Sequence, residues 1–501
     1  MRGRISLSGV SCVLLACGSD ALLQSDTSGS SAADAGSVVA VKHASDASTK
    51  RVDASSSAFI GHEDDGGPAC TGLSCQQAAC ANGGSTTISG TIYDPAGRNP
   101  LYNVVAYVPS EELAPLGSGA SCDTCASLYS GKPVATALSG ADGKFVIKDA
   151  PAGDNIPLVV QVGKWRRKTT LAHVTACQDN PQADKSLRLP KNRSEGDLPK
   201  IAISTGAADT LECLLRRIGV DASEYTPGAA GDGRIHIFQG GGANASVCVP
   251  LLGCQSVSVP NTSPPAPKAS QALWNSTESL SKYDLVLLSC EGEETENMNQ
   301  QALHDYASAG GRVFASHFHY SWFNSGPYAD ENIATWTPGS NSIGDIQASI
   351  VTKLPSGAPF VKGEALKEWL SNTNALTNGL LEIADAHQNA AIDVGQTAAQ
   401  SWIVGEPGQK GTGAVEYLSF NTPVENNPPA DGPSQVCGRV VYSDLHVGAA
   451  SGDAPQKPVP TSCVNAPLSP QEKALEFMLF DLSSCVTPET VPPVPPVPIV
   501  I

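Results

Sequence analysis

The chain has 501 residues and a mass of 51.5 kDa, enough for two or three domains at roughly 100 to 200 residues each. Its formal net charge of -18 argues against nucleic acid as a partner, because such binding needs clustered Lys and Arg to displace counterions from phosphates. Only 16% of the residues are charged, and 48 glycines and 37 prolines favour strands, turns and loops over long surface helices. One basic stretch, Lys164–Lys168, is interpreted as a solvated strand end.

The N-terminal residues 1–17 predict a secreted, lipid-anchored chain. Two arginines precede an apolar run over residues 5–16, which has the length of a secretory signal and is too short to cross a bilayer. The sequence Leu-Leu-Ala-Cys at residues 14–17 resembles the lipobox of bacterial lipoproteins. That resemblance implies cleavage before Cys17, acylation of its thiol and, because Gly18 is not acidic, anchoring to the outer membrane or cell surface. The alternatives are an uncleaved membrane segment or a chance match.

Low-complexity segments flank the body of the chain. Residues 18–69 are rich in Ser, Ala and Asp and poor in aromatics, so they cannot bury enough apolar area to offset the entropy of ordering. We expect a disordered tether there. The Pro-rich tail, residues 486–501, is expected to be polyproline II or disordered, with an apolar end able to dock on the body.

Cysteine usage predicts disulfides in an oxidising compartment. Removing Cys12 with the signal and Cys17 with the lipid leaves 13 of the 15 cysteines, so at least one is free or pairs with another chain. The close candidates for pairing are Cys122 with Cys125, Cys248 with Cys254, and two of Cys70, Cys75 and Cys80 in a Cys-rich segment over 70–82. The Cys-x-x-Cys at 122–125 is interpreted as a structural disulfide; a redox or zinc motif is the alternative.

Residues 83–190 predict a β-sandwich, since short alternating or apolar runs are separated by turn residues and no helical period interrupts them. The motifs SGTI at 89–92, DPAG at 94–97, ADGKF at 141–145 and PAG at 151–153 resemble, in order, those of the carboxypeptidase regulatory-like domain. The turn chemistry fits, because Asp-Gly adopts positive φ at a hairpin and the following Phe re-enters the core. The resemblance implies folding support or ligand and partner binding, without peptidase chemistry.

Residues 198–485 predict an α/β domain with a mostly parallel sheet flanked by helices. Buried strands ("KIAISTG", "RIHIFQG", "YDLVLLSC", "RVFAS") alternate with helical patterns, and strand-helix-strand order means a parallel sheet with covered faces. A closing helix is expected after Ser469, with that residue as cap and Pro470 in the first turn.

The runs "AGGRVFASH" and "GRVVYSDLHVG" in this domain are similar to the class I glutamine amidotransferase-like superfamily, especially its trehalose-utilisation branch. An amidotransferase needs Gly-x-Cys-x-Gly after this strand, whereas residues 315–319 read Ala-Ser-His-Phe-His, so glutaminase activity is not expected. Residues 324–400 are interpreted as an insertion over the site. Four aromatic residues either line a sugar-stacking pocket beneath it or pack the insertion: Trp322, Phe323, Trp336 and Trp402.

Ligands of open α/β sheets lie outside the carboxyl ends of the strands, where this sequence places four candidate metal ligands. His317 and His319 share a face if the strand stays extended, and Asp444 and His446 repeat the two-residue spacing after another strand. Three imidazoles and a carboxylate suit zinc or another borderline divalent metal with an open position for water. The alternative is that these histidines bond to loops and their aromatic neighbours cover the sheet.

A second candidate chemistry is nucleophilic. Cys290 lies at another strand's carboxyl end, with His317 as base and Glu291 or Glu293 to orient it. The alternatives are a disulfide or inert thiol at Cys290 and a solvated helix start for the acidic run.

Two functions follow from these observations. The first, which the missing elbow cysteine favours, is a cell-envelope lipoprotein whose α/β domain binds a glycan, small molecule or envelope protein. The second is a metal-dependent hydrolase of an extracellular or envelope substrate, using His317, His319, Asp444 and His446 as ligands and Glu291 as a more distant candidate base.

The anchor prediction is testable by metabolic lipid labelling. Cys17→Ser removes the thiol that the lipobox presents, so we expect the variant to lose the lipid label that the wild-type chain carries. Unchanged acylation of the variant would contradict the anchor.

Overall fold

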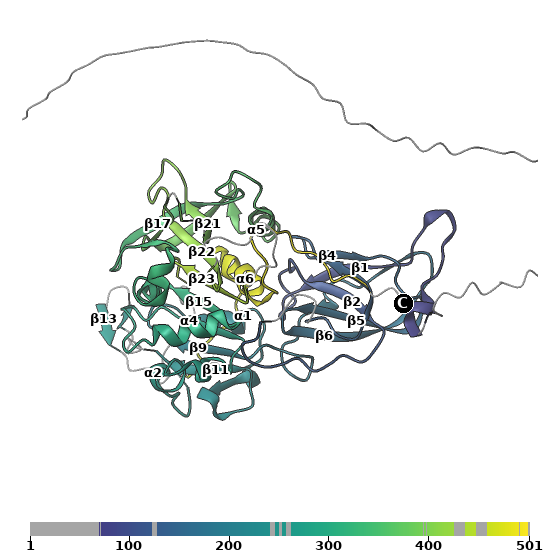
Figure 1. Ribbon diagram of the computed structural model, residues 1–501, viewed down its shortest axis with the longest axis horizontal. Helices are drawn as coiled ribbons and strands as arrows, with labels where there is room; N and C mark the ends of the chain where they lie inside the picture. Colours follow the sequence, from purple (N-terminus) through teal and green to yellow (C-terminus); the bar gives the residue numbers. More distant parts are fainter. Residues whose placement is uncertain are drawn as a thin grey trace, which may run out of the picture. The chain divides into compact units, whose positions relative to one another are not determined.

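The computed structural model describes residues 70, 72–122, 128–240, 246–249, 253–256, 262–393, 395–396, 398–424, 436–446, 458–489 and 491–498. The predicted signal, lipid anchor and tether, together with Cys125, lie outside these residues. The described part consists of several β-sheets, one of them large and mixed, with few helices (Figure 1). Within it, no helix combines the length and apolarity that a membrane crossing requires.

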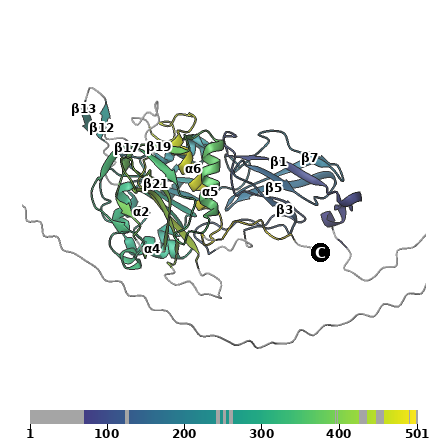
Figure 2. The same ribbon diagram turned by 90° about the horizontal axis from the view of Figure 1, so that it is seen from above.

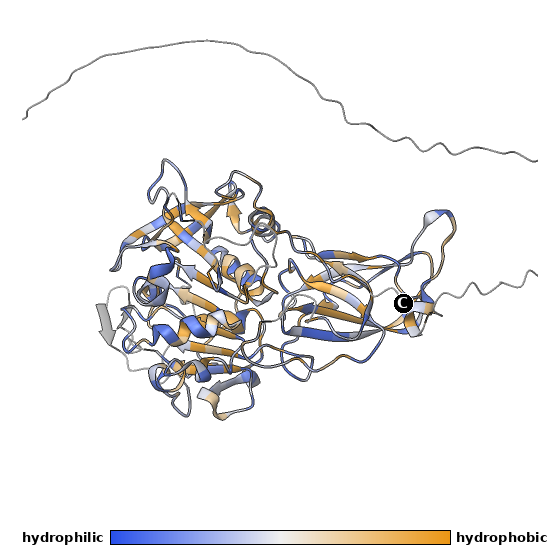
Figure 3. Ribbon diagram, viewed as in Figure 1, coloured by the Kyte–Doolittle hydropathy of each residue, from blue (hydrophilic) through white to orange (hydrophobic). Residues whose placement is uncertain are grey.

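The N-terminal half of the body consists of two four-stranded sheets. One has the order β3-β2-β5-β6; in the other, β1 pairs with β4, β7 and β8. Their bounds are β1 (Thr87–Tyr93), β2 (Val105–Pro109), β3 (Pro133–Leu138), β4 (Lys144–Ile147), β5 (Gly153–Val162), β6 (Trp165–Val174), β7 (Asp179–Pro181) and β8 (Leu187–Arg188). Apolar residues from both sheets belong to one core, as expected of a sandwich (Figure 3). Gly143 has φ +72° in the hairpin before β4, and Phe145 is buried, which confirms the predicted turn.

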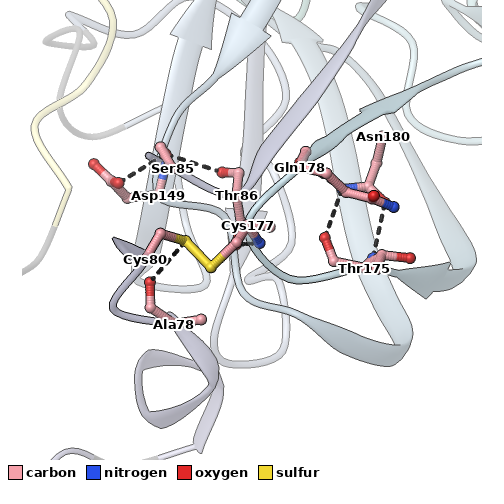
Figure 4. The surroundings of a disulfide bond; sticks show 9 residues. All are labelled: Ala78, Cys80, Ser85, Thr86, Asp149, Thr175, Cys177, Gln178 and Asn180. Atoms are coloured by element: carbon pink, nitrogen blue, oxygen red, sulfur yellow. Dashed lines mark hydrogen bonds between the residues drawn. A yellow bond between two sulfur atoms is a disulfide. The ribbon is translucent and has the colours of Figure 1, made fainter. Parts of the chain in front are cut away.

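One disulfide ties the Cys-rich segment, with its 3₁₀ turns η1 (Gly72–Gln76) and η2 (Ala81–Gly83), to the sandwich, and another lies within the segment. Cys70 bonds Cys75, so two of the three early cysteines pair as predicted, while Cys80 bonds Cys177. Figure 4 shows the second bond beside Thr86, whose hydroxyl accepts a hydrogen bond from the Cys177 amide at 2.8 Å.

The predicted bond between Cys122 and Cys125 is wrong, because Cys122 bonds Cys437. The cause is a tertiary approach that no local spacing reveals: the backbone around Cys122 runs so close to Gly310 that a Cβ there would lie 2.8 Å from the Cys122 nitrogen. Cys213 bonds Cys463, and Cys485 is also disulfide-bonded. The short hairpin of β12 (Ser246–Val249) and β13 (Gly253–Ser256) places Cys248 opposite Cys254 in register, and their bond stays a prediction.

An eleven-stranded sheet forms the second half, in the order β10-β11-β9-β14-β15-β23-β22-β21-β17-β19-β18 (Figure 1). From β10 to β23 neighbouring strands are parallel; from β23 to β18 they are antiparallel. The parallel strands are β9 (Ile201–Thr205), β10 (Tyr225–Pro227), β11 (Ile235–Gln239), β14 (Leu285–Leu288), β15 (Arg312–Ser316) and β23 (Gly438–Ser443). The others are β17 (Ser342–Ile350), β18 (Leu376–Thr377), β19 (Leu380–His387), β21 (Ala399–Gly405) and β22 (Val415–Thr422).

The sheet is therefore mixed rather than mostly parallel. Residues 324–400, expected as an insertion over the site, supply β17 and β19, which lengthen the sheet at one edge. The same segment also forms a small ribbon of β16 (Thr335–Trp336) and β20 (Ala390–Ala391).

Six helices accompany the sheet in the described residues: α1 (Leu211–Arg217), α2 (Ala269–Ala272), α3 (Thr277–Leu280), α4 (Gln300–Ser308), α5 (Val361–Asn372) and α6 (Pro470–Ser483). Four 3₁₀ turns lie between them: η3 (Ala222–Glu224), η4 (Gly228–Ala230), η5 (His317–Trp322) and η6 (Pro327–Glu331). Helix α6 begins with a capping box between Ser469 and Glu472 and has Pro470 in its first turn, as predicted.

Helix α6 joins the two halves. It lies beside α5 (Figure 2), and its Phe477 stacks on Tyr102 of the sandwich at a ring-centroid distance of 5.5 Å. Phe480 meets the edge of Trp165, also of the sandwich, at 5.8 Å. A single apolar core thus includes residues of both halves.

The sandwich contacts the large sheet at the amino ends of its parallel strands. Lys164 forms a 2.7 Å ion pair with Asp284, just before β14, and the Cys122–Cys437 bond attaches to the start of β23. The basic stretch at Lys164–Lys168 is therefore only partly solvated, since Arg166 is buried and Lys164 is half-buried, each in an ion pair. These contacts of the sandwich therefore lie away from the carboxyl ends of the strands.

Two acidic side chains meet where α6 packs on the sandwich. Glu476 is fully buried and accepts a 2.6 Å hydrogen bond from Asn99, and Asp94 lies beside it. Burial raises the pKa of Asp94 to about 6, and burial together with the Asp94 charge raises the pKa of Glu476 well above its usual value. The folded chain therefore holds protons here that the unfolded chain releases near pH 4.

We expect the free energy of unfolding to fall as the pH rises from about 4 through about 6, because groups with raised pKa stabilise the fold only while protonated. Glu476→Gln should raise the free energy of unfolding by about 1–3 kcal/mol at pH 8 and leave it unchanged at pH 4. Denaturant titrations at both pH values measure this, with the exposed Glu368→Gln on α5 as the control. An equal effect at both pH values would contradict the shared protonation.

Candidate metal centre

Parallel pairing sets three chain segments level at the carboxyl edge of the sheet. Leu288 of β14 is in register with Ala315 of β15, and Ser316 is in register with Ser443 of β23. Continuing each strand by one to three residues leads to Cys290, His317 and His446.

His317 lies at a sharp bend. Strand β15 ends at Ser316, and η5 starts at His317, whose φ of +42° is uncommon for a residue with a Cβ. The extended alternation stops there, so His319 does not share the face of His317. Instead, its Nδ1 bonds back to the Ser316 carbonyl at 2.9 Å, and its Nε2 lies 4.0 Å from a Glu291 carboxylate oxygen.

The His317 ring presents a lone pair to two neighbours. Its Nε2 lies 2.9 Å from the Ser340 carbonyl oxygen, which can only accept, so Nε2 carries the hydrogen in the neutral ring. Nδ1 is then the lone-pair nitrogen, and it lies 3.5 Å from the Cys290 sulfur and 3.0 Å from Nε2 of His446. Cys290 is a free thiol, and all three residues are buried.

His446 is oriented from its other side. Its Nδ1 lies 3.7 Å from an oxygen of Asp385, whose side chain is 66% exposed. The neighbouring His446 lowers the pKa of Asp385 to about 2. A carboxylate near Nδ1 favours a hydrogen there, as in carboxylate-histidine-metal arrangements, and in the neutral ring Nε2 is then a second lone pair toward His317.

His387 completes a cluster of three histidines. Its ring centroid lies 3.8 Å from that of His317 and 4.6 Å from that of His446. Its Nδ1 is buried without a hydrogen-bond partner.

The histidines differ in proton affinity. Burial, with the neighbouring histidines, lowers the pKa of His317 to about 3, and burial lowers the pKa of His387 to about 4, so both rings are neutral at pH 7. Burial also acts to lower the pKa of His446, but Asp209, Asp385 and Cys290 outweigh it and raise that pKa well above its usual value.

The distances match those between ligands of one tetrahedral ion. Nitrogens at about 2.05 Å from zinc lie about 3.3 Å apart, and a nitrogen lies about 3.6 Å from a thiolate sulfur bound at about 2.3 Å. The observed separations are 3.0 Å between nitrogens and 3.5 Å between nitrogen and sulfur. Cys290, His317 and His446 offer ligand atoms that all lie within 4.8 Å of one another, as do Asp385, His387 and His446.

Of the four predicted metal ligands, the structure brings together only His317 and His446. Asp444 lies next to the cluster but accepts hydrogen bonds from the backbone of Asn389 at 2.7 Å and Ala390 at 3.1 Å, and from the Tyr442 hydroxyl at 2.6 Å. It clamps the loop after β19 to the end of β23. Among the predicted catalytic residues, Cys290 and His317 are in contact, whereas Glu291 faces His319.

The sequence prediction does not include Asp385 and His387, because it treats residues 324–400 as an insertion over the site. Asp385-Ala386-His387 nevertheless ends strand β19 with the same Asp-x-His spacing as Asp444 and His446.

The aromatic residues near the site pack rather than line a pocket. Trp322, Phe323 and Trp402 are fully buried, and Trp336 packs on Phe323 and Tyr442. An open hollow of about 390 Å³ lies outside the loop that carries Ser340, lined among others by Thr337, Asn341 and Gln388.

Comparison with protein-family models found no match for the chain, and comparison with curated protein sequences found none. Two solved structures are weakly similar, both of type II cohesin-X-dockerin complexes from Acetivibrio cellulolyticus. One, a C-terminal interface mutant, has a TM-score of 0.14 and 14% identity over 24% of this chain and 76% of its own. The other, an N-terminal interface mutant, has a TM-score of 0.16 and 15% identity, and the match covers 27% of this chain and 85% of its own. At these TM-scores the likeness carries no argument about function.

The clamp role of Asp444 predicts a stability effect. Asp444→Ala leaves two buried backbone N–H groups without their acceptor, and each such group costs about 1–3 kcal/mol. We expect the free energy of unfolding to fall by at least about 2 kcal/mol in denaturant titration, against little change for the exposed Asp330→Ala. A fall no larger than that of the control would contradict the clamp.

Proposed function

We infer that the chain is a metal-dependent hydrolase, the second of the two functions that its sequence suggests. One observation carries this: Nδ1 of His317, left as a lone pair by the Ser340 carbonyl, faces both the Cys290 sulfur and Nε2 of His446. Two such nitrogens 3.0 Å apart repel unless they share a proton or both bind one metal ion. A thiolate and two imidazoles favour zinc or a similar borderline metal.

Each residue then has a role. Cys290, His317 and His446 would hold the metal, and Asp385 would orient His446. A metal held by three protein ligands keeps a position for water and lowers the pKa of that water toward 7. The Ser340 carbonyl fixes the His317 ring, and the burial of Cys290 and His317 limits the access of bulk water to them.

A thiol hydrolase is the second candidate, favoured by the 3.5 Å contact of the Cys290 sulfur with His317. Its imidazole would take the thiol proton. Complete burial of Cys290 disfavours direct attack on a large substrate. Ligand binding without catalysis is the third candidate, but it does not account for the convergence of the thiol and the imidazoles.

The setting proposed for this activity is the cell envelope. The lipobox at residues 14–17 supports anchoring through Cys17 to the outer membrane or cell surface, and the disulfides suit an oxidising compartment. The parallel strand run and the bend at His317 support an amidotransferase-like ancestry for the second half, with a histidine at the position of the nucleophile. The first half is proposed to be carboxypeptidase regulatory-like.

Metal analysis of the purified chain tests the proposal. We expect wild type to bind about one zinc equivalent at this centre and His317→Gln and Cys290→Ser to bind it at least about tenfold more weakly. His319→Gln is the matched control, because His319 is equally buried two residues away and faces Glu291 instead. Cobalt substitution should give a thiolate-to-cobalt absorption band that Cys290→Ser abolishes.

Activity gives a second readout. Hydrolysis of an activated aryl ester should be lost on chelation and restored by zinc in wild type and in His319→Gln. Equal, low metal content in wild type and His317→Gln would overturn the metal centre. Chelator-resistant hydrolysis abolished by Cys290→Ser would favour the thiol mechanism instead.

A further inference from the structure

His446 faces two groups of ligands with opposite nitrogens. Its Nε2 lies 3.0 Å from Nδ1 of His317 in the centre described above. Its Nδ1 lies 3.7 Å from the Asp385 carboxylate, in a second group that includes His387. Because the two nitrogens of an imidazole point away from each other, one ion cannot bind both.

The second group has ligand atoms of its own. Asp385, His387 and His446 offer a carboxylate oxygen and two imidazole nitrogens within 4.8 Å of one another. His387 is 97% buried, from its relative exposure of 3%, and its Nδ1 has no hydrogen-bond partner. A buried nitrogen without a partner is costly unless something binds it. Asp385, in contrast, is exposed, so an ion can enter from solvent.

Two simpler roles for these residues need no second ion. Asp385 could serve only to orient His446, but a 3.7 Å separation is long for the hydrogen bond that would fix the ring. His387 could be a fourth ligand of the first centre, yet the first group of mutually close ligand atoms comprises Cys290, His317 and His446, whereas His387 groups with Asp385.

We propose that Asp385, His387 and Nδ1 of His446 form a second divalent-metal site, so that His446 bridges two metal ions. This rests on the proposed function, since it shares His446 with that centre. Bridging requires His446 as imidazolate, and its Nδ1 proton leaves to solvent when the second ion binds. Carboxylate and imidazole ligands without a thiolate make this site harder than the first, suited to zinc or manganese. The pair would place a second Lewis acid at the solvent side, where a substrate arrives.

Equilibrium dialysis against zinc, followed by metal analysis, tests this on the purified mature chain. We expect about two ions per wild-type chain and about one in Asp385→Asn and in His387→Gln, with the cobalt-thiolate band of the first centre retained in both. His446→Gln should weaken both sites. Glu382→Gln is the matched control, because Glu382 is an exposed carboxylate on the same strand, β19, outside the group.

The outcomes separate this proposal from the proposed function. If wild type binds one ion and that binding depends on Cys290 and His317, the second site is overturned and the first remains. This holds whether Asp385→Asn and His387→Gln weaken the binding of that ion or leave it unchanged. No bound ion in wild type would overturn both. Two ions in wild type and in Asp385→Asn would place the second ion elsewhere and overturn the assignment.

Discussion

The parallel register of β14, β15 and β23 is the constraint on which the candidate site depends. Backbone hydrogen bonds hold Leu288, Ala315 and Tyr442 level across the three strands, so the residues that follow each strand meet at one edge. A shift of β15 by one residue would send its side chains to the opposite face and separate His317 from Cys290. All three strands are fully buried, which specifies that register strongly.

Two hydrogen-bond acceptors influence which ring nitrogen of each histidine carries the hydrogen. The Ser340 carbonyl fixes the His317 hydrogen on Nε2, and the Asp385 carboxylate favours a hydrogen on Nδ1 of His446. In both neutral rings the nitrogen without a hydrogen then points toward the other histidine. Without a metal, a proton between the rings relieves their repulsion, which agrees with the raised pKa of His446. A proton and a metal ion would therefore compete for the same nitrogens, as is general for imidazole ligands.

Sequence patterns predict the elements that depend on neighbouring residues. They fail where contacts between distant segments determine the structure. The hairpin at Gly143, the cap at Ser469 and the placement of His317 at a strand end all follow from local chemistry. The direction of the His319 side chain does not follow from local chemistry. The two-residue alternation holds only in extended backbone, and His317 leaves the extended conformation at φ +42°. Asp385 and His387 could not be assigned to the site without knowing that β19 adds to the sheet. The partner of Cys122 lies 315 residues away, beyond any spacing rule.

The sandwich attaches to the large sheet away from the candidate ligands. Its contacts with the large sheet lie at the amino ends of the parallel strands, through the Lys164–Asp284 ion pair and the Cys122–Cys437 bond, while helix α6 belongs to the one apolar core that both halves share. These contacts hold the strands without occupying their carboxyl ends. The candidate ligands lie at those ends, at the opposite edge from the sandwich contacts, so the sandwich can stabilise the strand frame without supplying a side chain to the cluster. Rigid strands then set the ligand distances, which is the arrangement that precise metal sites require.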